Sequence, residues 1–264
     1  MDGITRCSRY AFGPNRLHYC GPDANKEMKG LIENDPTHDG GLSHLLKQFK
    51  TLFPYLKHIA VANGIRDPFD SRVVEAYWLG NDLLATIEKR QLHSFLVDEM
   101  RLKDKINNKE FRKLEEKIGR GALPHHSFHV LNIWSQEGHT DLLESVARMG
   151  ECQVNSGIVV RVDGPKITVS TEPLVYEGGK LALGLPIERV ITRSLESEYD
   201  IERIKIGEIV SIHWGVPCEV ITKEQAETLR SYTLKNIAFA NTEVAPQCSI
   251  CSHIEFPSPP HFLL

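Results

Sequence analysis

The sequence predicts an α+β protein, with an all-α N-terminal domain followed by a small OB-like antiparallel β-barrel and a C-terminal helix. Between residues 42 and 148, apolar residues recur at every third or fourth position, which is the period of a helix. After residue 150 the pattern changes to short β-branched runs separated by glycine-containing turns. Thr222 and Gln225 then form a capping box in front of one more amphipathic helix.

Residues 1–41 are rich in turn formers and lack a clear period. Gly-Pro pairs stand at 13–14 and 21–22, and the stretch NDPTHDGG occupies 34–41. Glycine and proline interrupt regular secondary structure, so this part of the chain predicts an irregular N-terminal arm.

Residues 42–149 form the expected helical domain. Asp70 or Ser71 is a suitable N-cap for one of its helices, and Pro124 suits the first turn of another. Gly150 stands where it can end the last helix of this domain.

A β-rich domain is expected over residues 150–241. Its predicted strands lie in the runs GIVVRV at 157–162, KITVST at 166–171, KLALGL at 180–185, RVITRS at 189–194 and EIVSIHWG at 208–215. Short strands at this spacing indicate a small barrel or sandwich, which the helix after Thr222 closes. Residues 242–264 carry Pro, Ser and Cys without a period, as is typical of a mobile tail.

Charge and composition exclude several classes of partner. With 31 basic and 35 acidic residues the net charge is -4, so we expect no nucleic-acid partner and no membrane partner. The opening residues lack the apolar stretch of a secretory signal, and no apolar run approaches the roughly 18 residues of a membrane span. We therefore expect a cytoplasmic protein whose six cysteines are reduced thiols.

The sequence lacks the motifs of several enzyme classes, namely phosphate loops, nucleophile elbows, dinucleotide fingerprints and metalloprotease helices. This absence disfavours the enzyme classes that are built on them.

Residues 152–240 resemble the HypC/HupF family of hydrogenase-maturation chaperones. That family places a glycine five residues after a cysteine and continues through a strand, a turn and a second strand. Cys152, Gly157 and the following IVVRVDGPKITV have this arrangement. The segment IGEIVSIHWGVPCEVITKEQAETL at 206–229 is similar to a later part of the family, with His213 in the position of the family's histidine.

The resemblance implies an accessory chaperone or carrier in the maturation of nickel–iron hydrogenase. In that family a cysteine thiolate binds an iron centre that is being fitted with carbon monoxide and cyanide, and then passes it on. Cys152 would be the iron ligand here, His213 a second ligand or proton-handling neighbour, and the partner a maturation scaffold protein or the hydrogenase large-subunit precursor. A soft thiolate suits low-spin iron, and imidazole is an acceptable second donor. A metallochaperone of this kind is not itself an enzyme.

The stretch RYAFGPNRLHYCGPD at 9–23 also resembles the opening of an uncharacterised family associated with hydrogenase gene neighbourhoods.

Cys20 is a third candidate metal ligand. Gly21-Pro22 forces a turn beside it, and His18 and Asp23 are close in sequence, an arrangement that could expose and polarise a thiolate. The alternative is a tight turn with a tucked-in cysteine. If the chain folded Cys20 back toward Cys152, the two thiolates could share one iron.

Two further pairs are weaker candidates. His125 and His129 stand four residues apart, a helical spacing at which two imidazoles can grip one metal. They suggest an alternative function, a haem-dependent or non-haem iron enzyme with its site in the helical domain and the barrel as a docking module.

Cys248 and Cys251 form a single Cys-X-X-Cys, which is half of a zinc or redox motif. The remaining alternative is a docking protein without chemistry of its own.

Overall fold

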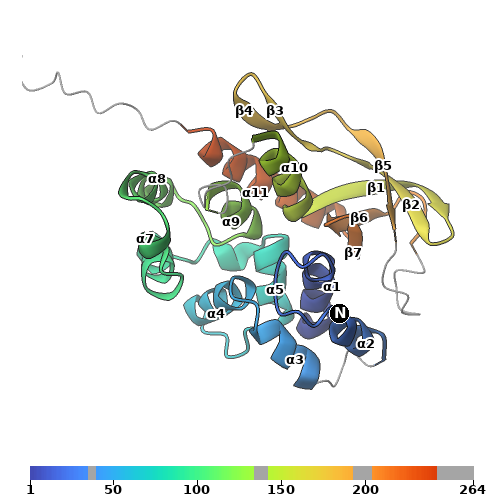
Figure 1. Cartoon of the computed structure of the whole chain (residues 1–264), viewed down its shortest axis with the longest axis horizontal. Helices are drawn as coiled ribbons and strands as arrows, with labels where there is room; N and C mark the ends of the chain where they lie inside the picture. Colours follow the sequence, from blue (N-terminus) through green and yellow to red (C-terminus); the bar gives the residue numbers. More distant parts are fainter. Residues whose placement is uncertain (35–39, 134–141, 193–203, 243–264) are drawn as a thin grey trace, which may run out of the picture.

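The computed structural model describes residues 1–34, 40–133, 142–192 and 204–242 (Figure 1). The helices that precede the strands are α1 (Gly3–Arg16), α2 (Asn25–Asn34), α3 (Gly40–Lys47), α4 (Leu52–Ala62), α5 (Ser71–Trp78), α6 (Lys89–Ser94), α7 (Leu102–Lys105), α8 (Asn108–Gly119), α9 (His126–Asn132) and α10 (Leu142–Cys152). A short 3₁₀ turn, η1 (Asp82–Leu84), precedes α6, and a π-helical turn, η2 (Phe95–Glu99), follows it. The last helix, α11 (Lys223–Ala240), follows the strands. This order of helices, strands and a final helix agrees with the predicted α+β class.

The N-terminal arm that was expected to be irregular is helical. α1 is capped by Asp2, whose side chain accepts the N–H of Thr5 at 3.0 Å, and it runs through Gly13 and Pro14. Most of α1 is buried, so tertiary packing outweighs the low helix propensity of glycine and proline. Gly13 is required by a close contact, because a Cβ there would lie 2.8 Å from the carbonyl oxygen of His213.

The helix starts predicted at Asp70 and Thr222 are confirmed, whereas Pro124 precedes the N-cap His125 of α9 and does not lie in its first turn. Asp70 caps α5 by accepting the N–H of Arg72 at 2.9 Å, and Thr222 forms the capping box of α11. The helix end predicted at Gly150 is wrong, because α10 continues to Cys152. Cys152 therefore closes a helix and does not open a strand. Within the described ranges, no helix combines the length and apolar character that crossing a membrane requires.

The strands form one curled antiparallel sheet and a separate hairpin. The sheet has the order β5 (Ile187–Thr192), β2 (Lys166–Thr171), β1 (Asn155–Asp163), β6 (Ile209–His213) and β7 (Val216–Ile221). The hairpin consists of β3 (Leu174–Glu177) and β4 (Lys180–Leu183). The five predicted runs overlap β1, β2, β4, β5 and β6. The edge strands β5 and β7 come close to each other, and the pairings among the described residues leave the sheet open between them.

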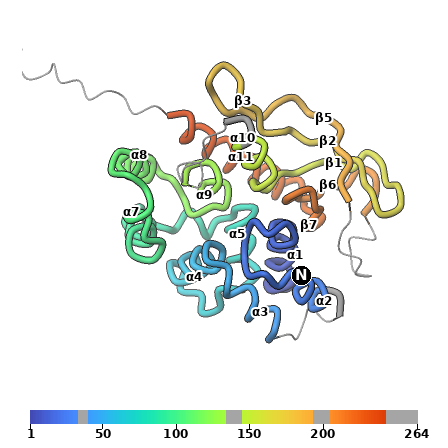
Figure 2. The backbone as a smooth tube through the Cα atoms, viewed as in Figure 1, coloured from blue at the N-terminus to red at the C-terminus, as the bar shows by residue number. Residues whose placement is uncertain are grey.

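One hydrophobic core joins the helical and strand-bearing parts. α1 packs against β6 and β7, and α11 lies between α9 and β1 (Figure 1 and Figure 2). Buried side chains of this core include Cys7 of α1, Ile212 of β6 and Leu229 of α11. The change of sequence pattern at residue 150 therefore does not divide the buried core.

A cluster of charged and polar side chains crosses the same boundary. The Arg6 guanidinium of α1 lies 2.7 Å from the Glu75 carboxylate of α5 and 3.2 Å from the Glu219 carboxylate of β7. The hydroxyl of Tyr10 donates a hydrogen bond to Glu219 at 2.9 Å. These charge-assisted bonds attach α1 to α5 and to β7, and they place the β6–β7 hairpin beside α1.

We expect Gly13→Ala to destabilise the protein by about 1–3 kcal/mol, because the new Cβ overlaps the backbone of the β6–β7 hairpin. Gly30→Ala in α2 is the matched control, since a Cβ there meets nothing within 4 Å. The control should be neutral or stabilising by up to about 1 kcal/mol, as alanine replaces glycine inside a helix. Urea unfolding curves of the two variants measure the difference. Equal stabilities would contradict the close packing of α1 on the hairpin.

Candidate functional site

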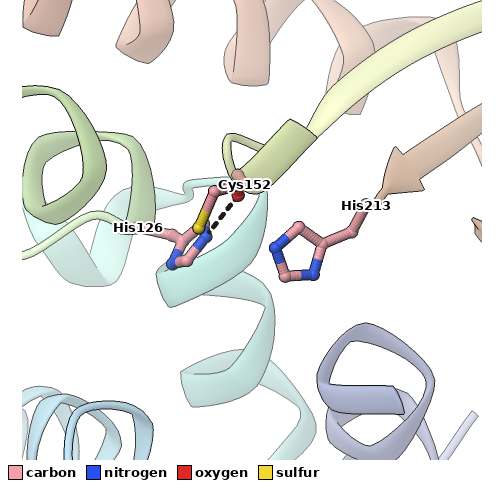
Figure 3. A group of neighbouring side chains, drawn as sticks. All are labelled: His126, Cys152 and His213. Atoms are coloured by element: carbon pink, nitrogen blue, oxygen red, sulfur yellow. Dashed lines mark hydrogen bonds between the residues drawn. The ribbon is translucent and has the colours of Figure 1, made fainter. Parts of the chain in front are cut away.

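Three side chains from distant parts of the chain converge on one point: His126 at the start of α9, Cys152 at the end of α10 and His213 at the end of β6 (Figure 3). The Cys152 sulfur and one ring nitrogen of each histidine lie within 4.8 Å of one another. Metal–nitrogen and metal–sulfur bonds are about 2.0–2.3 Å long, so small side-chain movements would bring these atoms to a single ion. The three residues form a candidate transition-metal site.

His213 is held in one orientation by a carbonyl group of α1. Its Nδ1–H donates a hydrogen bond to the carbonyl oxygen of Tyr10 at 2.7 Å. In a regular helix that carbonyl would accept the N–H of residue 14, but Pro14 has none. The hydrogen bond places the proton on Nδ1 and leaves the Nε2 lone pair free. Nε2 is buried and has no hydrogen-bond partner among the described atoms.

The backbone around Cys152 is fixed by the elements that carry the two histidines. The carbonyl oxygen of Cys152 accepts a hydrogen bond from the ring of His126 at 2.8 Å (Figure 3). The carbonyl oxygen of the preceding Glu151 accepts the N–H of Trp214, next to His213, at 2.9 Å. The end of α10 is thus attached on one side to α9 and on the other to the β6–β7 hairpin.

Both ring nitrogens of His126 have partners. Because a carbonyl oxygen only accepts, Nε2 carries the proton, and Nδ1 accepts from the hydroxyl of Tyr77 at 3.1 Å. A metal bound by His126 would replace one of these two hydrogen bonds. The Tyr77 hydroxyl and the Cys152 carbonyl are the kind of neighbours that orient a metal-binding imidazole.

Burial keeps all three groups electrically neutral at neutral pH. It lowers the pKa of His213 to about 4 and the pKa of His126 well below its ordinary range, with His213 adding to the effect on His126. It raises the pKa of the Cys152 thiol to about 12, to which the nearby Cys20 contributes, while the Trp214 indole acts in the opposite direction. Both imidazoles are therefore ready to bind a metal without losing a proton, whereas the thiol has to lose one.

The cluster lies in the wall of a cavity of about 150 Å³. Aromatic side chains form much of the remaining wall, and they are Tyr19, Phe49, Tyr77, Trp78 and Trp214. Cys20 and His129 also line the cavity. Such an apolar enclosure limits the access of water to a bound ion.

Trp214 occupies the tight turn between β6 and β7 in an unfavourable backbone conformation. Trp214 and Gly215 have φ angles of 52° and 68°, as in a two-residue turn that favours asparagine or glycine at the first of these positions. A bulky residue with positive φ costs on the order of 1 kcal/mol. The Trp214 ring stacks on the Tyr19 ring with the centroids 4.3 Å apart, and this contact offsets part of the backbone cost.

The structure brings together part of the predicted site. Cys152 and His213 lie in one cluster, and Cys20 lines the same cavity without belonging to that cluster. His126 was not among the predicted ligands, and the only signal for it in the sequence was the dense run PHHSFH. Its direction follows from the start of α9, which begins at His126 with His125 as its N-cap.

The histidine pair expected in the helical domain is divided between different partners. The ring of His125 contacts Ser127 at 2.8 Å and stacks on Tyr232. His129 Nδ1 lies 3.3 Å from the hydroxyl of Tyr55. An i, i+4 pair can share a metal only where both residues lie within the helix, whereas His125 precedes α9 as its N-cap. Cys248 and Cys251 lie outside the described residues.

Comparison with known proteins places the chain in a family. Residues 1–247 match DUF6390, a family of unknown function, and the chain belongs to it. The match includes all three residues of the cluster and crosses the change of pattern at residue 150. No curated protein and no solved structure matches the chain.

We expect His213 to be the Nδ1–H tautomer at pH 7 and to take up a second proton only near pH 4, because its ring is buried and its Nδ1–H is bonded to Tyr10. Histidine has an ordinary pKa of 6.5, so below that pH the unfolded chain binds a proton here that the folded chain does not. This contribution to the free energy of unfolding is complete above pH 6.5. As the pH falls from 6.5 towards 4, the loss of this contribution lowers the free energy of unfolding by roughly 3 kcal/mol.

Long-range ¹H–¹⁵N spectra of the imidazole groups report both the tautomer and its titration. In His213→Asn, the free energy of unfolding should fall less steeply between pH 6.5 and pH 4. The slope should be smaller by the amount that corresponds to about one bound proton. An Nε2–H tautomer, or a titration midpoint near 6.5, would contradict the arrangement.

Proposed function

We propose that this member of the DUF6390 family binds a transition metal, with iron as the cargo, through His126, Cys152 and His213. It would act as an accessory carrier in the maturation of nickel–iron hydrogenase. The observation that supports metal binding most directly is the free Nε2 lone pair of His213, buried beside a thiol and a second imidazole.

The chemistry of the three donors suits a soft or intermediate metal ion. One thiolate and two imidazoles are typical ligands for iron, copper, nickel and zinc, whereas magnesium and calcium prefer oxygen. Three protein ligands leave at least one coordination position for another group, which is what a carrier needs. The adjoining cavity of about 150 Å³ has room for small ligands on the ion.

The positions of the donors also fit a site that is formed before the metal arrives. His213 is oriented by the Tyr10 carbonyl, and the end of α10 is held by His126 at the Cys152 carbonyl and by Trp214 at the Glu151 carbonyl. The bonds of His213 and Trp214 are present without a metal and need not break when one binds, so the His213 ring and the end of α10 lose little conformational freedom on binding. Neutral imidazoles remove the competition from protons at neutral pH.

The assignment to hydrogenase maturation depends on the resemblance of residues 152–240 to HypC/HupF chaperones. In that interpretation the curled sheet is an OB-like barrel, consistent with the close approach of its edge strands β5 and β7. The partner would be a cytoplasmic maturation scaffold or the hydrogenase large-subunit precursor. The iron would carry carbon monoxide and cyanide.

We expect the full chain to bind about one Fe²⁺ under anaerobic conditions, and Cys152→Ala to weaken this binding by ~100-fold or more because the only thiolate of the cluster is lost. The parent protein for this measurement carries Cys248→Ser and Cys251→Ser, so that the C-terminal Cys-X-X-Cys cannot bind the metal. Competition with a chelator of known affinity gives the dissociation constants.

The matched control is Cys218→Ala, which removes a fully buried thiol of β7 that does not line the cavity. It should bind iron as the parent does. Undiminished iron binding by Cys152→Ala would show that the cluster is not the metal site.

The carrier role is tested on the complex of this protein with the maturation scaffold, isolated anaerobically from cells that assemble the hydrogenase, so that the cells supply the carbon monoxide and cyanide. We expect infrared bands of iron-bound carbon monoxide and cyanide in the complex and their loss in Cys152→Ala, because the iron would no longer be held. Bands that persist undiminished in Cys152→Ala would contradict the carrier role. Equal partner binding after loss of both Cys20 and Cys152, without metal transfer, would favour a docking protein.

A further inference from the structure

We propose that Cys20 is a transit ligand, which binds the metal on its way between solvent and the cluster of His126, Cys152 and His213. This inference rests on the proposed function and adds a route by which the site is loaded and emptied. The observation behind it is that a second thiol lines the same cavity but stands outside the cluster of possible resting ligands.

Cys20 lies on the more open side of the cavity. Cys20 and Cys152 are both partly exposed residues, but the Cys20 thiol is the less deeply buried of the two. Its neighbour Tyr19 is 52% exposed, whereas His126 and His213 are buried. Tyr19, Cys20 and Trp214 line the cavity together with the cluster. An ion that enters beside Tyr19 and Trp214 would therefore meet the Cys20 thiol on its way to Cys152.

The loop that carries Cys20 is held in place by α1. The side-chain amide of Asn15 donates hydrogen bonds to the carbonyl oxygens of Cys20 at 3.0 Å and of Pro22 at 2.6 Å. Gly21 has a φ angle of 87° and packs directly on Phe49, because a Cβ there would lie 2.3 Å from the aromatic ring. These contacts fix the turn that directs Cys20 to the cavity.

Where the exposed Tyr19 borders the cavity, three side chains are stacked on one another. The Tyr19 ring stacks on Trp214, and the guanidinium of Arg148 lies 5.7 Å from the centre of the Tyr19 ring. Tyr19 belongs to the Cys20 loop, Trp214 follows His213, and Arg148 is in the same helix as Cys152. The stack therefore joins the segments that carry Cys20, Cys152 and His213 at one side of the cavity.

A transit ligand speeds exchange because metal–ligand bonds are replaced one at a time. The Cys20 thiol first loses its proton to the buffer as its sulfur binds the ion. The Cys152 thiol then loses its proton as the second metal–sulfur bond forms. When the bond to Cys20 breaks, the Cys20 thiolate takes up a proton, and the metal keeps its oxidation state throughout. Release is the reverse sequence.

The experiment compares rates and affinities of Co²⁺ binding in the full chain, under anaerobic conditions and with Cys248→Ser and Cys251→Ser in every sample. The thiolate-to-cobalt charge-transfer band reports binding where Cys152 is present, and stopped-flow mixing with metal or with a chelator gives the rates of uptake and release. Competition with a chelator of known affinity gives the dissociation constant of every variant, including Cys152→Ala. We expect Cys20→Ala to slow both rates by ~10-fold and to change the dissociation constant by less than ~3-fold. Cys152→Ala should instead lose affinity, and Cys218→Ala should match the parent.

Three results would overturn the proposal. Unchanged uptake and release rates in Cys20→Ala would leave Cys20 without a role in transit. An affinity loss in Cys20→Ala as large as that in Cys152→Ala would make Cys20 a resting ligand. Absence of Co²⁺ binding by the parent would remove the proposed function as well, so the two failures are distinguishable. A far-ultraviolet circular dichroism spectrum identical to that of the parent shows that each variant is folded.

Discussion

The hydrogen bond from His213 to the carbonyl oxygen of Tyr10 is the interaction on which the candidate site depends. It exists because Pro14 has no N–H to donate within α1, so that this carbonyl is free to accept from another element. The bond fixes the tautomer of His213, and the remaining nitrogen faces Cys152 and His126 (Figure 3). A proline that looks like a helix breaker in the sequence thus supplies the acceptor that orients a metal ligand.

The same contact explains why the helical and strand-bearing parts form one structure. α1 provides the Tyr10 carbonyl, and its Gly13 allows the β6–β7 hairpin to approach closely. The Arg6 pairs with Glu75 and Glu219 fasten α1 to its neighbours on both sides. Neither part contains the whole cluster, since His126 comes from the helices and His213 from the sheet. The family match across residue 150 is consistent with this dependence.

The sequence indicated the order of helices and strands but not the contacts between them. Cys152 and His213 were predicted from short spacings within a resembling segment, and the structure places them together. α1 was not predicted, because burial against the sheet stabilises a helix whose local sequence favours a turn. His126 was not predicted, because the direction of its side chain depends on where α9 begins and on a hairpin far along the chain. Local patterns do not encode such long-range packing.

X-ray absorption at the iron edge reports the atoms bound to the metal, and so it shows whether Cys152 and the two histidines hold the iron. The sample is the iron-loaded full chain with serine in place of Cys248 and Cys251. We expect one sulfur neighbour at about 2.3 Å together with imidazole nitrogens at a shorter distance, and loss of the sulfur signal in Cys152→Ala. A shell of oxygen and nitrogen atoms without sulfur in the parent protein would contradict it.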